Sequence, residues 1–556
     1  MKKSISSILK AAIPAALTAF LLAAAGCSST DGAAKNLAQV QEASAEKTVV
    51  EVEQGKLRGS VTENGVYSFK GVPYAEAKER FVPASPAQKW DGVRDATQYG
   101  KISPQMEFMS TNMVSDEVSS NACQNLNIWT PSPDKKKRAV MVWLHGGGFS
   151  SGSAQETPTY DGSNLSKKGD VVVVSVNHRL NILGYFDLSS YGEKYRYSGN
   201  AGIQDIVDAL GWIKRNIASF GGDPENVTVF GESGGGAKVM ALMTTPRVKG
   251  LFKRGIIESG STDTMGVVFT KKEVASYITE QTLKSLGITK DNIEEIQKVP
   301  YAKLLAAGEK VLADAGKELG VDGAFGPGTA LMWEPVVDGD FMPTDPVTKD
   351  GFAENGRGIP LLIGSNLNEW TSVPLLGNAE SEKAKLESYT EADIIAEAKK
   401  TYGSKAEAVV AEYKKAYPNE KLYNALFIDT LIRLPIIKTT ARKADQNAGN
   451  VYSYIFTYGA PFSFHTFELP YVFDNPKTNV MGKTNTNPET DIKVAEMMSS
   501  VWLAFAKTGN PSTAETGNWE PYTRANGSVM LLGEKNELVH HHDENLLKLL
   551  APEYKW

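Results

Sequence analysis

Ser233 stands in the pentapeptide Gly231-Glu232-Ser233-Gly234-Gly235, between a β-branched run at 227–230 and an apolar segment that begins near Ala237. This order predicts a strand, a sharp glycine-flanked turn and a helix, which would hold the serine hydroxyl out at the end of a sheet. The N–H group after the serine and the start of the helix would both face a developing negative charge. The segment therefore favours a nucleophilic serine that attacks a carbonyl group.

A nucleophilic serine needs a base, and the chain has six histidines. Three of them, 540–542, are consecutive, and the alternation of side chains along an extended segment makes a shared metal site there poor geometry. His145 and His178 follow apolar runs, and His178 is expected to be packed or hydrogen-bonded. His465 lies in a turn-like segment downstream of the serine, as the chain order serine, acid, histidine requires. We therefore expect His465 to be the base.

The acid that orients the base should lie between Ser233 and His465 in the chain. Glu369 closes the segment 363–369 after an apolar run. It would stand at the carboxyl end of a strand, where open α/β sheets place their sites. Asp338 and Asp340 satisfy the same spacing, so the residues alone leave three carboxylates open.

A run of three glycines, 146–148, follows His145 directly after another apolar run. Residues without a Cβ allow backbone N–H groups to come close to a substrate oxygen. Negative charge develops on that oxygen during acyl transfer, and preorganised donors stabilise it. The run is therefore expected to supply hydrogen-bond donors to the site.

Four apolar, β-branched runs without polar alternation lie at 140–144, 171–176, 227–230 and 360–363. Such runs are typical of parallel strands that are covered on both faces. Between the second and third runs, apolar residues recur at helical spacing over 205–220. The sequence therefore predicts an α/β fold with one large, mostly parallel central sheet and helices on both faces.

Residues 48–556 are expected to form a single catalytic domain, because no internal repeat and no break between folding units is visible. The segments 265–330 and 380–450 are rich in alanine, lysine and glutamate, and we expect them to be helical insertions over the sheet. The loop 104–120 carries several methionines. It is interpreted as a mobile apolar rim of the site or, equally well, as surface packing.

The start of the chain has the layout of an export signal, with two lysines, an apolar run and small residues directly before Cys27. We interpret 1–26 as a lipoprotein signal peptide, Cys27 as the site of a lipid anchor and 27–47 as a flexible tether. An ordinary cleaved signal peptide is the alternative. The expected location is outside the cytoplasm on a bacterial membrane, at the cell surface or the periplasmic face.

The net charge is −6, from 59 basic and 65 acidic residues, which gives no reason to expect a nucleic-acid partner. The chain has two cysteines, Cys27 and Cys123. With Cys27 lipidated, we expect no structural disulfide. Neither a metal site nor a cofactor is indicated.

Beyond the single motifs, the chain resembles the type-B carboxylesterases of the cholinesterase family, which have the α/β-hydrolase fold, here in a bacterial lipoprotein form. The similarity runs from about residue 48 to 550, and its landmarks occur in the family's order. They lie at 71–75, 126–131, 145–149, 199–202, 220–224, 231–235, 335–339, 366–369, 465–471 and 502–511. Many motifs in one order are more specific than any single motif.

Carried over residue by residue, the resemblance implies that Ser233 is the nucleophile. It implies His465 as the base and Glu369 as the acid. It also implies that Glu232 and Glu468 are buried carboxylates that tune the site electrostatically. These roles agree with the order that the residues themselves suggest.

The resemblance further implies an oxyanion hole made by the backbone N–H groups of Gly147, Gly148 and Gly234. The site departs from the family pattern at Gly234 and Thr466. Gly234 stands where the family often has alanine, which would remove a methyl group from the floor of the pocket. Thr466 stands where the family has glycine, which could narrow the approach to His465.

The implied function is hydrolysis of small-molecule carboxylic esters through an acyl-enzyme at Ser233, with no cofactor and no metal. Because His465 must be neutral to act as base, activity is expected to fall on acidification through roughly pH 6–7. Two alternatives stay open. One is a lipase that acts on long-chain glycerides, and the other is a non-catalytic adhesion or binding protein of the same fold.

Overall fold

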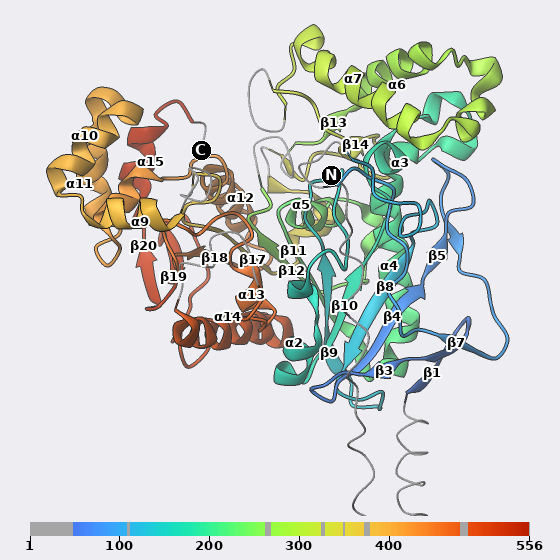
Figure 1. Cartoon of the computed structure of the whole chain (residues 1–556), viewed down its shortest axis with the longest axis horizontal. Helices are drawn as coiled ribbons and strands as arrows, with labels where there is room; N and C mark the ends of the chain where they lie inside the picture. Colours follow the sequence, from blue (N-terminus) through green and yellow to red (C-terminus); the bar gives the residue numbers. More distant parts are fainter. Residues whose placement is uncertain are drawn as a thin grey trace, which may run out of the picture. The chain divides into compact units, whose positions relative to one another are not determined.

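The computed structural model describes residues 48–107, 112–261, 268–323, 329–348, 351–371, 379–478 and 487–554. Residues 48–556 form one compact unit (Figure 1). The expected signal peptide, tether and lipid-anchor cysteine lie outside the described residues. No helix in the described ranges is both long enough and apolar enough to cross a membrane.

The unit is built around one sheet that has eleven strands in the described residues. From one edge to the other they are β20 (Glu537–His540), β19 (Ser528–Leu532), β18 (Val451–Phe456), β17 (Leu361–Asn366), β12 (Arg254–Glu258), β11 (Gly222–Glu232), β9 (Arg138–Leu144), β10 (Val172–Val176), β8 (Asn125–Thr130), β4 (Tyr67–Pro73) and β3 (Ser60–Val61). The neighbours from β19 to β10 are parallel, and the pairs at both edges are antiparallel. The predicted mostly parallel centre is thus flanked by antiparallel strands.

The central strands are buried on both faces because their apolar side chains alternate between two cores. In β9, Val140, Val142 and Leu144 belong to one apolar cluster, whereas Met141 and Trp143 belong to another. Successive side chains of a strand point to opposite faces, so an uninterrupted apolar run serves two layers at once. This is why the run lacked polar alternation.

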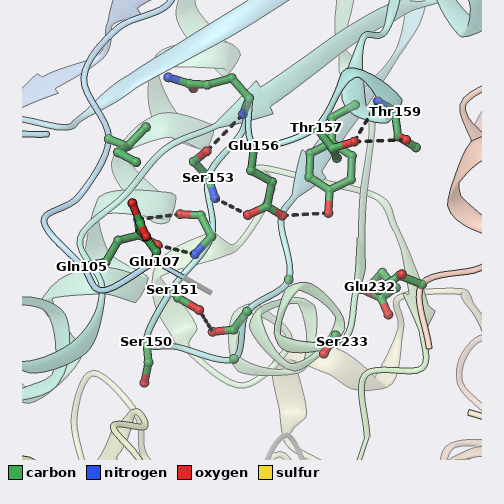
Figure 2. Close-up of a pocket in the computed structure, with 18 of the residues that line it drawn as sticks. Gln105, Glu107, Ser150, Ser151, Ser153, Glu156, Thr157, Thr159, Glu232 and Ser233 are labelled. Carbon is green, nitrogen blue, oxygen red and sulfur yellow. Dashed lines mark hydrogen bonds between the residues drawn. The ribbon is translucent and has the colours of Figure 1, made fainter. Parts of the chain in front are cut away.

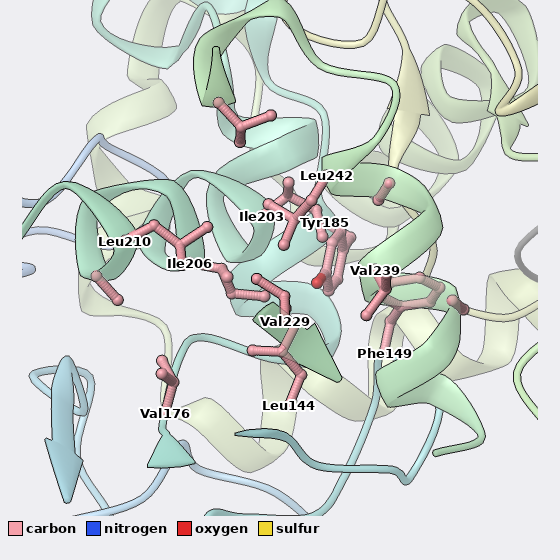
Figure 3. Packing of buried hydrophobic residues seen from close by; sticks show 14 of the residues in the cluster. Leu144, Phe149, Val176, Tyr185, Ile203, Ile206, Leu210, Val229, Val239 and Leu242 are labelled. Atoms are coloured by element: carbon pink, nitrogen blue, oxygen red, sulfur yellow. The ribbon is translucent and has the colours of Figure 1, made fainter. Parts of the chain in front are cut away.

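Helices cover both faces, as the sequence predicts. The described helices are α2 (Ser163–Gly169), α3 (Asn181–Tyr185), α4 (Ala201–Asn216), α5 (Gly234–Leu242), α6 (Lys272–Leu286), α7 (Tyr301–Leu319), α8 (Glu354–Arg357), α9 (Ala379–Glu387), α10 (Glu391–Tyr402), α11 (Ala406–Ala416), α12 (Arg433–Asp445), α13 (Leu469–Val472), α14 (Pro488–Thr508) and α15 (Glu544–Leu550). α4 and α5 pack on the face of Leu144, and α2 and α14 on the face of Trp143. Figure 3 shows Ile203, Ile206 and Leu210 of α4 beside residues of three strands.

The two segments expected to be helical insertions contain helices. α6 and α7 pack against each other in the first segment, and α10 and α11 do so in the second. They lie on opposite sides of the molecule in Figure 1. The helix predicted over 205–220 begins earlier, at Ala201, and becomes a 3-10 turn after Asn216.

Small sheets complete the unit. In a three-stranded sheet, β2 (Gly55–Arg58) lies between β1 (Val49–Val52) and β7 (Val93–Asp95). The two-stranded sheets pair β5 (Ala75–Glu76) with β6 (Ser85–Pro86), β13 (Thr270–Lys271) with β14 (Val336–Val337), and β15 (Val347–Thr348) with β16 (Gly351–Phe352).

The predicted site residues follow four strands, β9, β11, β17 and β18, and β12 lies between β11 and β17 in the sheet. The glycine run follows β9, Ser233 follows β11, and Ser259 follows β12. Glu369 lies shortly after β17 and His465 after β18. Carboxyl ends of parallel strands meet at one edge of a sheet, which explains how residues more than 300 positions apart in the chain come together.

Candidate active site

Ser233 joins the end of β11 to the start of α5, with backbone angles of φ 55° and ψ −125°. Such a conformation costs a non-glycine residue about 1–3 kcal/mol and persists only where its surroundings impose it. The chain can turn this tightly because a neighbour lacks a side chain: a Cβ on Gly235 would lie 2.0 Å from the Leu144 carbonyl oxygen. α5 begins at Gly234 rather than near Ala237. The serine therefore stands directly before the helix N-terminus.

His465 forms a buried pair with Glu369, whose Oε2 lies 2.6 Å from Nδ1 of the ring. The other oxygen of Glu369 accepts hydrogen bonds from the Ser259 hydroxyl at 2.5 Å and from the Asn366 N–H at 2.7 Å. Both carboxylate oxygens are thus occupied. With Nδ1 held by the acid, Nε2 is the ring nitrogen that faces other partners.

The two other carboxylates that the sequence left open lie elsewhere. Asp338 accepts a hydrogen bond from the Asn200 side chain at 3.1 Å. Asp340 pairs with Arg196 at 2.8 Å and with Arg247 at 3.2 Å on the surface. Of the three, Glu369 is the one that the structure brings to the histidine.

Nε2 of His465 faces Glu232, the residue before the serine, at 3.2 Å from Oε1. The Trp370 ring covers the imidazole, with the ring centres 4.9 Å apart and the planes tilted by 32°. Ser233 and His465 line the same cavity, and no hydrogen bond joins their side chains in the part of the chain that the structure describes. His465 and Glu369 are therefore paired with each other, and Ser233 lines the same cavity.

Buried carboxyl groups control the charge of the imidazole. Burial lowers the pKa of His465, but the negative charges of Glu232, Glu369 and Glu468 outweigh this effect and raise the pKa above its ordinary value. Burial raises the pKa of Glu232 well above its usual range. The pKa of Glu468 is raised to about 7 by burial and by the charge of Glu369. The Asn366 amide donates to Glu468 at 2.6 Å, which favours the charged form.

The glycine run forms a turn over the start of α5. Gly147 and Gly148 have φ values of 77° and 60°, which favour glycine. Within the described ranges, no acceptor takes the N–H of either residue. The N–H of Gly234, in the first turn of α5, has no intrahelical partner. Three backbone donors therefore stand near Ser233, at the positions that the resemblance implies.

The space left by the missing methyl group of Gly234 is not open pocket. A Cβ at this position would lie 2.2 Å from the carbonyl oxygen of Gly148 and 2.4 Å from its nitrogen. The glycine turn occupies the volume that an alanine would need. This corrects the expectation of a wider pocket floor: Gly234 allows the turn to come closer to the helix.

A cavity of about 1000 Å³ opens in front of the serine. Figure 2 shows part of its wall, with Ser233 and Glu232 at one end and Gln105 and Glu107 at the other. Apolar side chains line it on several sides: Tyr99, Ile102, Val114, Val118, Met332, Trp370, Leu431, Ile432 and Leu469. The loop 104–120 thus borders the cavity through its described residues.

Two buried histidines lie outside the reacting centre. His145 and His178 stack with their ring centres 5.0 Å apart, and burial lowers the pKa of both well below the ordinary value. Near them, Arg179 and Asp205 form a buried ion pair at 2.7 Å. His178 is packed, as expected.

A model of the carboxylesterase family matches residues 46–548 of the chain. The chain belongs to the carboxylesterase family. This carboxylesterase is 35% identical over 519 residues to the para-nitrobenzyl esterase of Bacillus subtilis (strain 168), covering 91% of this chain and 98% of the relative. It is 30% identical to the bile salt-activated lipase of Rattus norvegicus, covering 87% of this chain and 81% of the relative.

A solved structure gives the same result for the fold. An esterase from anaerobic Clostridium hathewayi that can hydrolyze aliphatic aromatic polyesters superposes with a TM-score of 0.79 at 34% identity, covering 91% of this chain and 98% of the other. The carboxylesterase therefore has the α/β-hydrolase fold, and it is a carboxylic ester hydrolase.

Several residues of the carboxylesterase site were not found from the sequence. Ser259 follows a strand in the segment 254–261 and could have been suspected from that position. Trp370 directly follows the acid. Lys238 is a lysine inside an apolar, fully buried helix. That contrast with its neighbours was the available signal, because a lysine is almost never buried without a partner.

Proposed function

We propose that this carboxylesterase hydrolyses esters by acyl transfer to Ser233. His465 accepts the serine proton as the oxygen attacks the ester carbonyl, and Glu369 holds the imidazole through Nδ1. The hydrogen bond between serine and histidine forms when the ester binds. His465 then protonates the departing alcohol, and water repeats the sequence on the acyl-enzyme.

In this proposal the N–H groups of Gly147, Gly148 and Gly234 stabilise the charged oxygen of the tetrahedral intermediate. Each such donor typically contributes about 10²–10³ in rate. The observation that carries the proposal is the buried His465–Glu369 pair at 2.6 Å beside a serine on a strained turn. The carboxylates Glu232 and Glu468 favour the imidazolium that forms in the transition state.

Replacing the nucleophile tests these roles. Ser233→Ala is expected to lower kcat on p-nitrophenyl butyrate by at least about 10³-fold, because covalent catalysis is lost. Ser150→Ala, on the wall of the same cavity, is a matched control that keeps every proposed catalytic group. A Ser233→Ala enzyme with near wild-type kcat would contradict the proposal.

For the substrate, we propose uncharged esters of medium size that carry an apolar or aromatic group. The cavity of about 1000 Å³ and its apolar lining support this, as does the relative that can hydrolyze aliphatic aromatic polyesters. A panel of esters that varies the acyl and alcohol groups separately tests it. Higher kcat/KM for charged or very small esters than for aromatic ones would contradict it.

The lipase alternative makes a different prediction. A lipase acts at an interface, so its rate on tributyrin would rise sharply above the solubility limit. We expect the carboxylesterase to saturate below that limit. The relationship to a bile salt-activated lipase is what makes this comparison worthwhile.

We further propose that the enzyme is exported and held on a bacterial membrane by a lipid on Cys27. The basic start, apolar run and small residues before this cysteine support the proposal. Cys27→Ala should release active enzyme into the soluble fraction and abolish incorporation of labelled palmitate. Membrane retention and labelling in that variant would contradict the anchor.

A further inference from the structure

Lys238 lies on α5, five residues after Ser233, and its side chain is fully buried. Its ammonium donates hydrogen bonds to three carbonyl oxygens of one short segment: His145 at 2.8 Å, Gly146 at 3.4 Å and Gly148 at 2.8 Å. An ammonium group has three N–H donors. This segment takes all of them, and within the described residues no carboxylate forms a salt bridge with Lys238.

One of these bonds, to the Gly146 carbonyl, orients the peptide group that carries a proposed oxyanion donor, and the other two hold the peptide groups on either side of the two donors. In a trans peptide the C=O and the N–H point in opposite directions. The Gly146 carbonyl faces Lys238, so the N–H of Gly147 in the same peptide group points away from the lysine. The Gly147 carbonyl accepts hydrogen bonds from the N–H groups of Ser150 and Ser151 at 3.2 and 3.0 Å. The N–H of Gly148, in that peptide group, therefore points away from these two serines.

The turn is also drawn close to α5. The backbone of Gly148 fills the place where a Cβ on residue 234 would stand, 2.2 Å from its carbonyl oxygen. The same carbonyl is bound by Lys238, one turn further along the helix. A single helix thus supplies both the room for the glycine turn and the group that holds it there.

We propose that Lys238 is a positioning residue for the oxyanion hole, which holds the glycine turn 145–148 in the conformation that presents its N–H donors to the reacting carbonyl. Lys238 acts through the turn and does not touch the ester. The proposal rests on the oxyanion-hole roles proposed above for Gly147 and Gly148. Without the ammonium, three carbonyl oxygens lose their partner. The peptide group of the Gly147 N–H then loses the bond that orients it, and the groups on either side of the two donors are no longer held.

The chain offers a matched control in Lys443. It is also fully buried, on α12, and its ammonium donates to the carbonyl oxygens of Gly356, at 3.0 Å, and Arg357, at the end of α8. It does not line the cavity of Ser233. Lys443→Met therefore removes a buried lysine and its carbonyl contacts at a distance from the site.

The experiment compares Lys238→Met and Lys443→Met with the wild-type enzyme, using p-nitrophenyl butyrate and an alkyl trifluoromethyl ketone. The ketone forms a tetrahedral adduct on the serine and so reports on the oxyanion hole. Lys238→Met should lower kcat by about 10- to 100-fold, change KM by less than about threefold, and weaken the ketone by the same factor as kcat/KM. Lys443→Met should leave kcat within about twofold of the wild-type value, even if its Tm falls as far as that of Lys238→Met.

A folded Lys238→Met enzyme with wild-type kcat and ketone affinity would overturn the proposal. So would an equal loss of kcat in Lys443→Met, because the effect would then be a general one of buried lysines. If Lys238→Met does not fold, Lys238→Gln replaces it in the experiment, because its amide keeps two N–H donors. An intermediate kcat with weakened ketone binding would then support the proposal, whereas an unchanged kcat would refute it. Near wild-type kcat in Ser233→Ala would instead refute the proposed function itself.

Discussion

Nε2 of His465 lies 3.2 Å from Oε1 of Glu232, the residue that immediately precedes Ser233. The carboxylate therefore favours the protonated imidazole, the form that the base takes in the transition state. The same charge raises the pKa of His465, so the ring keeps its proton up to a higher pH than usual. It must lose this proton before it can act as a base. The pH dependence of the enzyme reports on this balance.

The acidic limb of kcat/KM is expected above the ordinary histidine pKa of about 6.5, because the folded pKa of His465 is raised and only the neutral ring is a base. This moves upward the fall that the sequence placed at roughly pH 6–7. Glu232→Gln removes a negative charge, lowers the pKa of His465, and should shift the limb to lower pH by about one unit. A pH–rate profile with p-nitrophenyl butyrate measures it.

Glu225→Gln is the control for that profile, since Glu225 lies on the same strand but is exposed and paired with Lys214. Its limb should coincide with that of the wild-type enzyme. An acidic limb that stays in place or moves to higher pH in Glu232→Gln would show that Glu232 does not set the charge of the base.

The Ser259 hydroxyl donates a hydrogen bond at 2.5 Å to Oε1 of Glu369, the oxygen that does not bind His465. Ser259→Ala should lower kcat about tenfold, because a hydrogen bond to a charged group contributes roughly 1.5–3 kcal/mol. KM should change little. Ser261→Ala removes a buried hydroxyl two residues further on that bonds Thr439 instead, and it should keep the wild-type kcat. Equal effects of the two substitutions in steady-state kinetics would contradict the role of Ser259.

Gly234→Ala should lower kcat by about 10²–10³, the value of an oxyanion donor. The added Cβ has to displace the Gly148 backbone, which lies 2.2–2.4 Å from its position. Gly211→Ala, on the partly exposed α4, meets only the end of the Arg215 side chain and should leave kcat unchanged. If Gly234→Ala is as active as the wild-type enzyme, the close approach of the turn is not required for catalysis.

Thr466 adopts φ 78° directly after the base, a conformation that is strained for a β-branched residue. Thr466→Gly should therefore raise the free energy of unfolding by about 1 kcal/mol, since relief of strain exceeds the added entropy of the unfolded glycine. Urea denaturation measures the change. A lower free energy of unfolding in the variant would mean that contacts of the threonine outweigh the strain.

The sheet and the nucleophile were accessible from the sequence because both are local patterns. The run 140–144 is apolar without alternation because β9 packs on both faces. The turn at Ser233 is marked by glycines whose Cβ atoms would clash. Such features depend on neighbours in the chain or on burial alone.

The acid was not settled by local pattern, because the choice among Glu369, Asp338 and Asp340 depends on which strand ends adjoin. Likewise, Gly234 was interpreted as widening the pocket, whereas a distant segment fills the space. Lys238 was overlooked, since its partners lie some 90 positions earlier in the chain. In each case the outcome depends on which segments far apart in the chain lie next to each other in the fold, and a local pattern does not contain that information.

The central claim is that Ser233 forms a covalent acyl-enzyme, and a fluorophosphonate ester tests it most directly. The phosphonyl group should be found by peptide mass spectrometry on the peptide that contains Ser233, with one group bound per chain and a matching loss of p-nitrophenyl butyrate hydrolysis. Labelling of another residue, or full activity with Ser233 modified, would contradict the account.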